Sequence, residues 1–257
     1  MNRFIAALPM YDWPEARAET DAEWARLRDA FRAAGIDAPE HLARQNADMP
    51  PVPGGIRDGE GNVIAPDPAT LPPDEFDLPT LWRHPDLLFA QACWGPMELG
   101  LARHVRVVGQ PDYSAFEGGQ GELYSSVLLM RAEEPSDLNI PVHGSSRLPL
   151  DLIRSKRLAY NSDDSMSGII ALTRDLAAMG ESLDVFSQRL ETGGHRRSIV
   201  AVAEGKADVC AADCRSWAMA RRFEPASGRL RVVGWTGLRK GLPIIAARGA
   251  PHYSVPL

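Results

Sequence analysis

Two short polar segments of the sequence hold residue types that could bind an oxyanion. The first, 160–168, contains Ser165 and Ser167, and the second, 190–198, contains a pair of glycines followed by His195. Each segment follows an expected strand and precedes an expected helix. At such a turn the first helical N–H groups lack partners within the helix, and the positive end of the helix dipole points outward. Backbone N–H groups, serine hydroxyls and the imidazole could then surround one anion.

Each segment also has a plain structural explanation. The serines can be helix caps, and Gly193-Gly194 can be a tight turn. For either segment alone this explanation is preferred, whereas two such turns in one half of the chain favour a binding site. Neither segment matches the Walker pattern or the dinucleotide fingerprint, so nucleotide binding is disfavoured.

Asp213 and Tyr124 are further candidates for the same site. Asp213 follows an expected strand, where its carboxylate could accept a hydrogen bond from a protonated ligand oxygen. That contact would favour hydrogen phosphate or a phosphonate over sulfate, which has no proton to donate. Capping of the next helix explains Asp213 equally well. Tyr124 could present its hydroxyl to a cleft, although a strand tyrosine more commonly lies in the core.

Other chemistries have weaker support. Cys210 and Cys214 lack a second Cys/His pair at zinc spacing, so no metal ion is expected, and no cofactor either. Ser198, His195 and Asp213 have the residue types of a hydrolase triad, but there is no Gly-x-Ser-x-Gly elbow. Three cysteines are too few for a disulfide framework and indicate a reducing compartment.

Strands and helices alternate along most of the chain. Strands are expected at 4–8, 86–90, 105–108, 123–130, 157–160, 207–212, 230–233 and 242–246. Helices are expected at 20–34 with a capping box at Thr20, at 96–103, 167–179 and 198–204, and through Trp217. This alternation indicates an α/β fold with a largely parallel sheet. The segment 39–79, with nine of the 21 prolines, is expected to be a long surface excursion with a hairpin at 58–62.

Composition sets outer limits on function. The chain has 257 residues, a net charge of −6 and 44% hydrophobic residues, which suits one large domain or two lobes. Mild acidity argues against nucleic-acid binding. No apolar window is long enough to insert in a membrane, and 4–8 is too short for a signal-peptide core. As written, the sequence predicts a cytoplasmic protein, or a periplasmic one if a leader has been removed.

Six motifs, taken in order and spacing, resemble one known family. They are Leu8-Pro9-Met10-Tyr11-Asp12, residues 88–96, Gly121-Glu122-Leu123-Tyr124-Ser125-Ser126-Val127, residues 159–168, residues 192–195 with 203–209, and Gly234-Trp235-Thr236. The sequence is similar to substrate-binding proteins of phosphate, phosphite and phosphonate ABC transporters. The resemblance implies a two-lobed, type II periplasmic-binding-protein fold, with mainly parallel sheets flanked by helices and a ligand cleft between lobes. Lobe one would span 1–118 and 217–257, including the 39–79 excursion, and lobe two 119–216.

The resemblance also implies which residues face the ligand. The oxyanion would lie against Ser165, Met166 and Ser167, with Tyr124, His195 and Asp213 around it, and Tyr11 and Trp94 of lobe one would close over it. The expected function is binding of a small anionic ligand without catalysis, with an ABC-transporter permease as a further partner.

Two alternatives remain open at this point. The first is a cytosolic enzyme or sensor on the same fold that uses His195 and Asp213. The second is a regulatory protein that contacts its partner through the 39–79 excursion.

Overall fold

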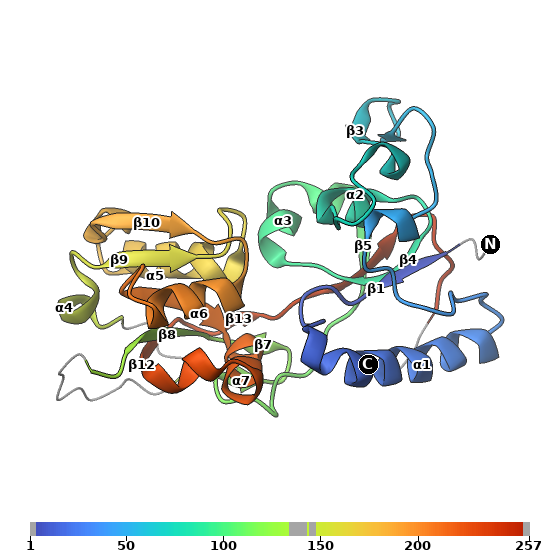
Figure 1. Cartoon of the computed structure of the whole chain (residues 1–257). Coiled ribbons are helices and arrows are strands. Elements are labelled where there is room, and N and C mark those ends of the chain that lie inside the picture. The colour runs from blue at the N-terminus through green and yellow to red at the C-terminus, as the bar shows by residue number, and fades with distance from the viewer. Residues whose placement is uncertain (1–3, 134–142, 144–147, 254–257) are drawn as a thin grey trace. The chain divides into compact units, whose positions relative to one another are not determined.

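The computed structural model describes residues 4–133, 143 and 148–253, and it separates into two units (Figure 1). Unit 1 comprises Met1–Pro111 and Leu242–Leu257, and unit 2 comprises Asp112–Gly241. The expected two-lobed α/β architecture is therefore present. The boundaries differ from the expected ones, because 112–118 and 217–241 belong to unit 2 and not to lobe one. The largest part of this difference arises because 230–235 forms a strand of the unit 2 sheet.

Unit 1 is built on a four-stranded sheet in the order β1 (Ile5–Ala7), β4 (Leu87–Gln91), β14 (Ile244–Ala247) and β5 (Val105–Gly109). β1 runs parallel to β4, whereas β14 is antiparallel to both β4 and β5. α1 (Arg17–Ala33) covers one face of the sheet, and α2 (Leu78–Arg83) and α3 (Trp94–Glu98) cover the other (Figure 1).

Helix α1 was predicted correctly from the spacing of its apolar residues, but its first residue was not predicted. Trp24, Leu27 and Phe31 lie on one face and pack in the core, as their spacing predicts. The predicted capping box at Thr20 is wrong, because the helix begins at Arg17, directly after the 3-10 turn Pro14–Ala16. The Thr20 hydroxyl instead donates to the Ala16 carbonyl, 3.3 Å away.

The 39–79 excursion is an ordered part of unit 1. The expected hairpin is present, formed by β2 (Ile56–Arg57) and β3 (Val63–Ala65) around the turn at 58–62. The buried side chain of Asn46 connects the beginning of this segment to its end. Its amide N–H donates to the Pro72 carbonyl and its amide oxygen accepts from Asp77 N–H, each at 2.8 Å. The regulatory role suggested for this segment stays a prediction.

Unit 2 is built on a five-stranded sheet in the order β10 (Gln188–Glu191), β9 (Arg157–Tyr160), β11 (Val209–Asp213), β8 (Ser126–Arg131) and β12 (Leu230–Trp235). β9 is parallel to β10 and β11, and β8 is antiparallel to β11 and β12. Both main sheets are therefore mainly parallel, as expected, and each contains one strand of opposite direction, β14 in unit 1 and β8 in unit 2. The antiparallel strands β8 and β14 each follow a crossing of the chain between units, and so they are not parts of strand–helix–strand crossovers.

A small second sheet in unit 2 has the order β13 (Arg239–Lys240), β7 (Leu123–Tyr124) and β6 (Gly119–Gln120). The single strand expected at 123–130 is thus two strands, interrupted at Ser125. The first strand joins the small sheet and the second joins the main one.

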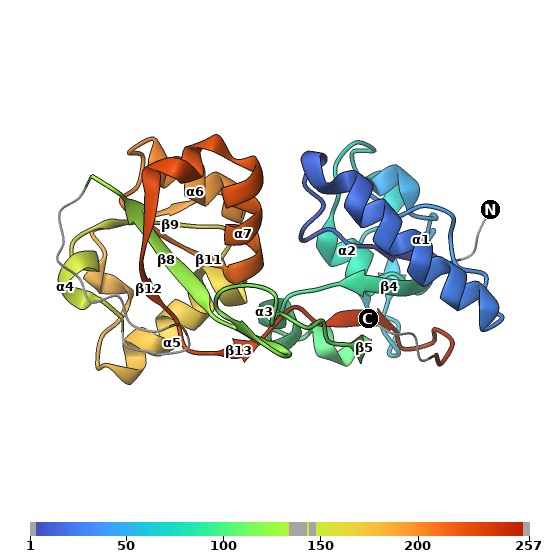
Figure 2. The same cartoon turned by 90° about the horizontal axis from the view of Figure 1, so that it is seen from below.

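Helices cover both faces of the unit 2 main sheet. α4 (Leu150–Ile153) precedes β9, and the π-helical turn η5 (Met166–Ile170) continues directly into α5 (Ala171–Ala178). α5 packs on one face, and α6 (His195–Ala203) covers the opposite face (Figure 2). α7 (Cys214–Phe223) follows β11. Short 3-10 turns complete the described chain at Asn46–Asp48, Pro68–Thr70, Leu101–Arg103, Leu183–Val185 and Pro225–Arg229. Within the described ranges no helix has the length and apolar character needed to cross a bilayer.

Candidate ligand-binding site

Several of the candidate residues lie at one edge of the unit 2 sheet. β9 and β11 are parallel, so their carboxyl ends at Tyr160 and Asp213 lie at the same edge. β8 runs in the opposite direction, so its first residue, Ser126, pairs with Asp213 there. The carboxyl ends of strands are where α/β sheets bind ligands.

Helix turn η5 begins at this edge and forms the first candidate binding element. Ser165 is its N-cap and accepts a hydrogen bond from Gly168 N–H at 3.1 Å. The Ile170 N–H donates to the Ser165 carbonyl at 3.0 Å, which makes the turn wider than an α-helical one. Such π-helical turns are frequent at functional sites. Ser165, Met166 and Ser167 are all buried.

Asn161 joins the two polar turns that the sequence singled out. Its carbonyl accepts a hydrogen bond from Gly193 N–H at 2.8 Å. Its side-chain oxygen lies so close to Gly168 that a Cβ at that position would be only 1.8 Å away. Glycine is therefore required at position 168 by the close approach of Asn161, since any side chain would clash with it. The backbone conformation of Gly168 does not itself require glycine.

His195, the first residue of α6, lies between the other two candidates. Its Nε2 is 2.8 Å from the Ser167 hydroxyl and 3.5 Å from Asp213 Oδ2. The other oxygen of Asp213 accepts from Ser216 N–H at 2.8 Å, so Asp213 also caps α7. The helix-capping explanation for Asp213 is thus correct, and it leaves one carboxylate oxygen directed at His195.

Burial and neighbouring charge determine the protonation state of the His195 imidazole. Burial lowers the pKa of His195 below its ordinary value, and the nearby Asp213 carboxylate offsets only part of that effect. The imidazole is therefore neutral at pH 7. Asp213 favours the tautomer with the proton on Nε2, which can then donate to the Ser167 oxygen. In that arrangement the Ser167 O–H remains available to donate to a ligand oxygen.

The same geometry differs from that of a hydrolase triad. In such a triad the serine and the carboxylate contact opposite nitrogens of the histidine. Here Ser167 and Asp213 both lie on the Nε2 side, and the buried Nδ1 has no hydrogen-bond partner among the described residues. Ser198, the other serine considered, is hydrogen-bonded to the Thr192 hydroxyl at 2.7 Å.

The remaining sequence candidates are Tyr124 in unit 2 and Tyr11 and Trp94 in unit 1. Tyr124 is buried in β7 with its ring 5.2 Å from that of Tyr113, as the core explanation expects. Tyr11 and Trp94 belong to unit 1, where they follow the parallel strands β1 and β4 and so lie at the carboxyl-end edge of that sheet.

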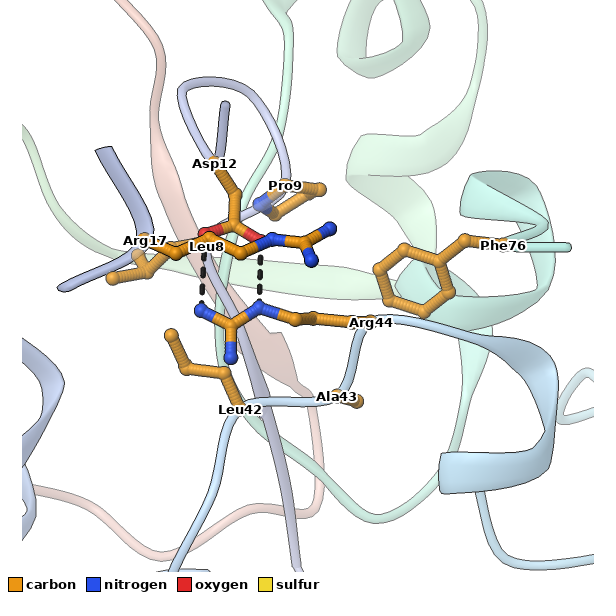
Figure 3. Close-up of a pocket in the computed structure, with 8 residues that line it drawn as sticks. All are labelled: Leu8, Pro9, Asp12, Arg17, Leu42, Ala43, Arg44 and Phe76. Carbon is orange, nitrogen blue, oxygen red and sulfur yellow. Dashed lines mark hydrogen bonds and ion pairs between the residues drawn. The ribbon is translucent and has the colours of Figure 1, made fainter. Parts of the chain in front are cut away.

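A cavity of about 160 Å³ lies within unit 1 near the end of β1 (Figure 3). Inside it Arg44 donates two hydrogen bonds to Asp12, from Nε at 2.6 Å and from Nη2 at 3.0 Å. Arg17 adds a longer contact to Asp12 at 3.7 Å. None of the residues that line the cavity was predicted from the sequence to bind a ligand. They are Leu8, Pro9, Asp12, Arg17, Leu42, Ala43, Arg44 and Phe76. The pairing was not predictable, because Arg44 comes from the excursion, 32 residues after Asp12.

No cluster of three or more metal-ligating side chains occurs among the residues with described positions. Cys93, Cys210 and Cys214 are buried and form no disulfide bond. Burial raises the pKa of Cys210 and Cys214, so neither is a reactive thiolate.

Two α/β units joined by two chain crossings define a periplasmic-binding-protein-like fold of type II. Similar structures include PhnD1 of Prochlorococcus marinus in complex with methylphosphonate, at 14% identity and TM-score 0.62, covering 97% of this chain and 78% of that one. A binding protein of a Pseudomonas aeruginosa phosphonate ABC transporter is 16% identical with TM-score 0.56, covering 96% and 70% of the two chains. A Xanthomonas citri protein bound to chloride is 15% identical with TM-score 0.55, covering 97% and 79%.

The family model described as the periplasmic phosphonate substrate-binding protein of ABC transporters matches residues 101–253. Since this is more than half of the sequence, the chain belongs to that family. It is thus a substrate-binding component and not an enzyme, so the binding hypothesis is supported over the enzymatic one. No curated protein matches the sequence.

Proposed function

We propose that the chain binds a phosphonate, or a phosphate-like oxyanion of the same shape, at the edge of the unit 2 sheet. The observation that supports this most is the linked group Ser167–His195–Asp213 at the start of η5. The N–H groups at the start of η5 and the hydroxyls of Ser165 and Ser167 supply hydrogen-bond donors. The positive end of the η5–α5 dipole adds favourable electrostatics for an anion.

Asp213 would select the protonation state of the ligand. A carboxylate beside an anion is repulsive unless a proton lies between the two oxygens. A monoprotonated phosphonate or hydrogen phosphate supplies that proton, whereas sulfate does not at neutral pH. We therefore assign to this site a preference for phosphorus oxyanions over sulfate.

Four further residues predicted from the sequence are kept in the proposed binding site, although the main argument does not depend on them. We retain Met166 as a residue of the η5 turn and Tyr124, Tyr11 and Trp94 as ligand-facing residues, on the strength of family resemblance alone. The relative bound to methylphosphonate supports a small phosphonate as the first ligand to test.

Family membership also indicates a place in the cell and a partner. We propose a periplasmic location, in keeping with the family, and delivery of the ligand to the permease of an ABC transporter.

Isothermal titration tests the binding proposal. Methylphosphonate, phosphite and phosphate are titrated separately into the protein, with sulfate as the comparison anion. The double variant Ser165→Ala/Ser167→Ala should weaken binding by about 1–3 kcal/mol, because a charged ligand loses two hydroxyl contacts.

Ser182→Ala is the matched control. Ser182 is also a helix N-cap, accepting from Asp184 N–H at 3.1 Å, but it caps the short turn after α5. Its loss should leave affinity unchanged. Absence of heat with all three phosphorus oxyanions, together with no shift in melting temperature, would disprove the proposal.

A further inference from the structure

Ser126 carries a buried hydroxyl that the structure does not otherwise explain. Its residue surface is 1% exposed, and its Oγ has no hydrogen-bond partner among the described residues. Buried side-chain hydroxyls are nearly always hydrogen-bonded, since leaving one unsatisfied is costly. The neighbouring Ser125 hydroxyl is equally buried and also lacks a partner within the described part of the chain.

The strand register places Ser126 beside the candidate site. In the antiparallel ladder of β8 and β11, Ser126 pairs directly with Asp213. Residues paired in this way share one face of the sheet. Met130 and Val209, at the other end of the same ladder, pack against α5. Because side chains alternate along a strand, Ser126 and Asp213 lie on that α5 face, the face on which η5 begins.

The backbone of Ser126 is held rigidly. Its N–H donates to the Thr236 hydroxyl at 2.8 Å, and its carbonyl accepts from Thr236 N–H at 2.9 Å. Thr236 is itself buried at the end of β12. A hydroxyl presented from such a fixed strand position is pre-organised for a ligand, which lowers the entropic cost of binding.

We propose that Ser126 is a further ligand-binding residue, whose hydroxyl contacts the oxyanion next to Asp213. This inference rests on the function proposed above. A hydroxyl donates one hydrogen bond, whereas a carboxylate only accepts. Ser126 and Asp213 together therefore fit a ligand with an ionised oxygen beside a protonated one. Monoanionic phosphonates and hydrogen phosphate have both, so the pair determines specificity as well as affinity.

Ser126→Ala tests the inference, with Ser125→Ala as the matched control. Ser125 precedes β8 and is not paired with Asp213. Titration with methylphosphonate should show the dissociation constant of Ser126→Ala raised about tenfold, the effect of one hydrogen bond to a charged group. The melting temperature of the ligand-free variant should stay the same or rise, because an unsatisfied buried hydroxyl is removed. Ser125→Ala should bind within about twofold of the parent protein.

The outcomes separate this inference from the proposed function. If the parent protein binds and Ser165→Ala/Ser167→Ala weakens binding, while Ser126→Ala does not, then the role of Ser126 is wrong and the proposed function stands. Equal losses in Ser125→Ala and Ser126→Ala would also overturn it, since a general packing defect would explain both. If the parent protein binds none of the phosphorus oxyanions, both proposals fail.

Discussion

The Ser167 hydroxyl lies 2.8 Å from Nε2 of His195, although the two residues are 28 positions apart in the sequence. This contact joins the first turn of η5 to the first residue of α6, so the amino ends of two helices meet. Asp213, 3.5 Å from the same nitrogen, adds the carboxyl end of β11. Three elements thus converge at one sheet edge, and two of them are helix amino ends, where backbone N–H groups favour anions.

The pH dependence of stability should reveal the buried state of His195. Its pKa in the folded protein is lowered from 6.5 by burial, so the folded state resists protonation. The stability this provides is present above pH 6.5 and is lost as the pH falls below it. His195→Gln, which does not titrate there, should therefore lose less stability than the parent protein between pH 7.5 and 5.5. Urea unfolding midpoints at several pH values measure the difference.

His84 provides the comparison for this experiment. Burial lowers its pKa as well, and its Nε2 lies 2.9 Å from the Pro50 carbonyl. Part of the pH dependence should therefore persist in His195→Gln and disappear only in the double variant with His84→Gln. An unchanged profile in His195→Gln would show that its imidazole is protonated as easily in the folded state as in the unfolded chain.

Much of the fold follows from local sequence patterns, and the limits are instructive. The apolar spacing of Trp24, Leu27 and Phe31 correctly predicted a helix, and Gly35, at φ +79°, ends it as predicted. The predicted start of this helix at Thr20 was wrong, because the 3-10 turn before it leads directly into the helix at Arg17. Strand direction was less predictable, because the antiparallel position of β14 depends on the return of the chain from unit 2.

The candidate site was only partly predictable from sequence. Ser165, Ser167, His195 and Asp213 come directly after strands or begin helices, so the strand–turn–helix pattern identified them. Ser126 gave no such signal, since a serine at the start of a strand is ordinary. The role proposed for Ser126 depends on the register between β8 and β11, which is a long-range property. The pairing of Arg44 with Asp12 was equally hidden from local patterns.

Gly168→Ala should impair both stability and binding. Its Cβ would lie 1.8 Å from Asn161 Oδ1 in a buried position, so either Asn161 or the start of η5 must move. Overpacking of this kind costs about 1–3 kcal/mol. Displacement of η5 should also weaken methylphosphonate binding about tenfold or more, by misplacing the η5 N–H groups. Thermal unfolding and titration measure the two effects.

Gly228→Ala is the control for that substitution. Nothing lies within 4 Å of a Cβ at Gly228, so this variant should behave like the parent protein. Adding Asn161→Ala to Gly168→Ala should recover part of the lost stability by removing the clashing oxygen. A Gly168→Ala variant with normal stability and affinity would contradict the close packing of Asn161 on η5.

Asp12→Ala should destabilise unit 1 more than Asp21→Ala, although both carboxylates bind Arg44. The Asp12 side chain is 11% exposed and accepts two hydrogen bonds from Arg44, whereas that of Asp21 is 55% exposed and accepts one. Charge-assisted bonds in partly buried positions contribute about 1.5–3 kcal/mol, while exposed pairs contribute about 0–1 kcal/mol. Urea unfolding of both variants gives the comparison, and equal losses would contradict this difference in burial.

Asp208→Asn should test the main ion-pair network of unit 2 and its pH dependence. Asp208 accepts hydrogen bonds from Arg157 Nε and N–H at 2.9 and 3.0 Å and from Arg131 at 3.0 Å. The hydrogen bond from Arg157 holds the pKa of this carboxyl far below its ordinary value. A lowered pKa stabilises the folded state above the ordinary pKa of 3.8, and that stability is lost as the pH falls. With allowance for solvent screening, the variant should be about 1–2 kcal/mol less stable than the parent protein at pH 7, and this difference in stability should narrow below pH 4.

Glu181→Gln is the control, because it breaks an exposed pair with Arg154 and should leave the unfolding midpoint nearly unchanged. A stability gap for Asp208→Asn that stays constant from pH 7 to pH 3 would mean that the Asp208 carboxylate does not stabilise the fold through its charge.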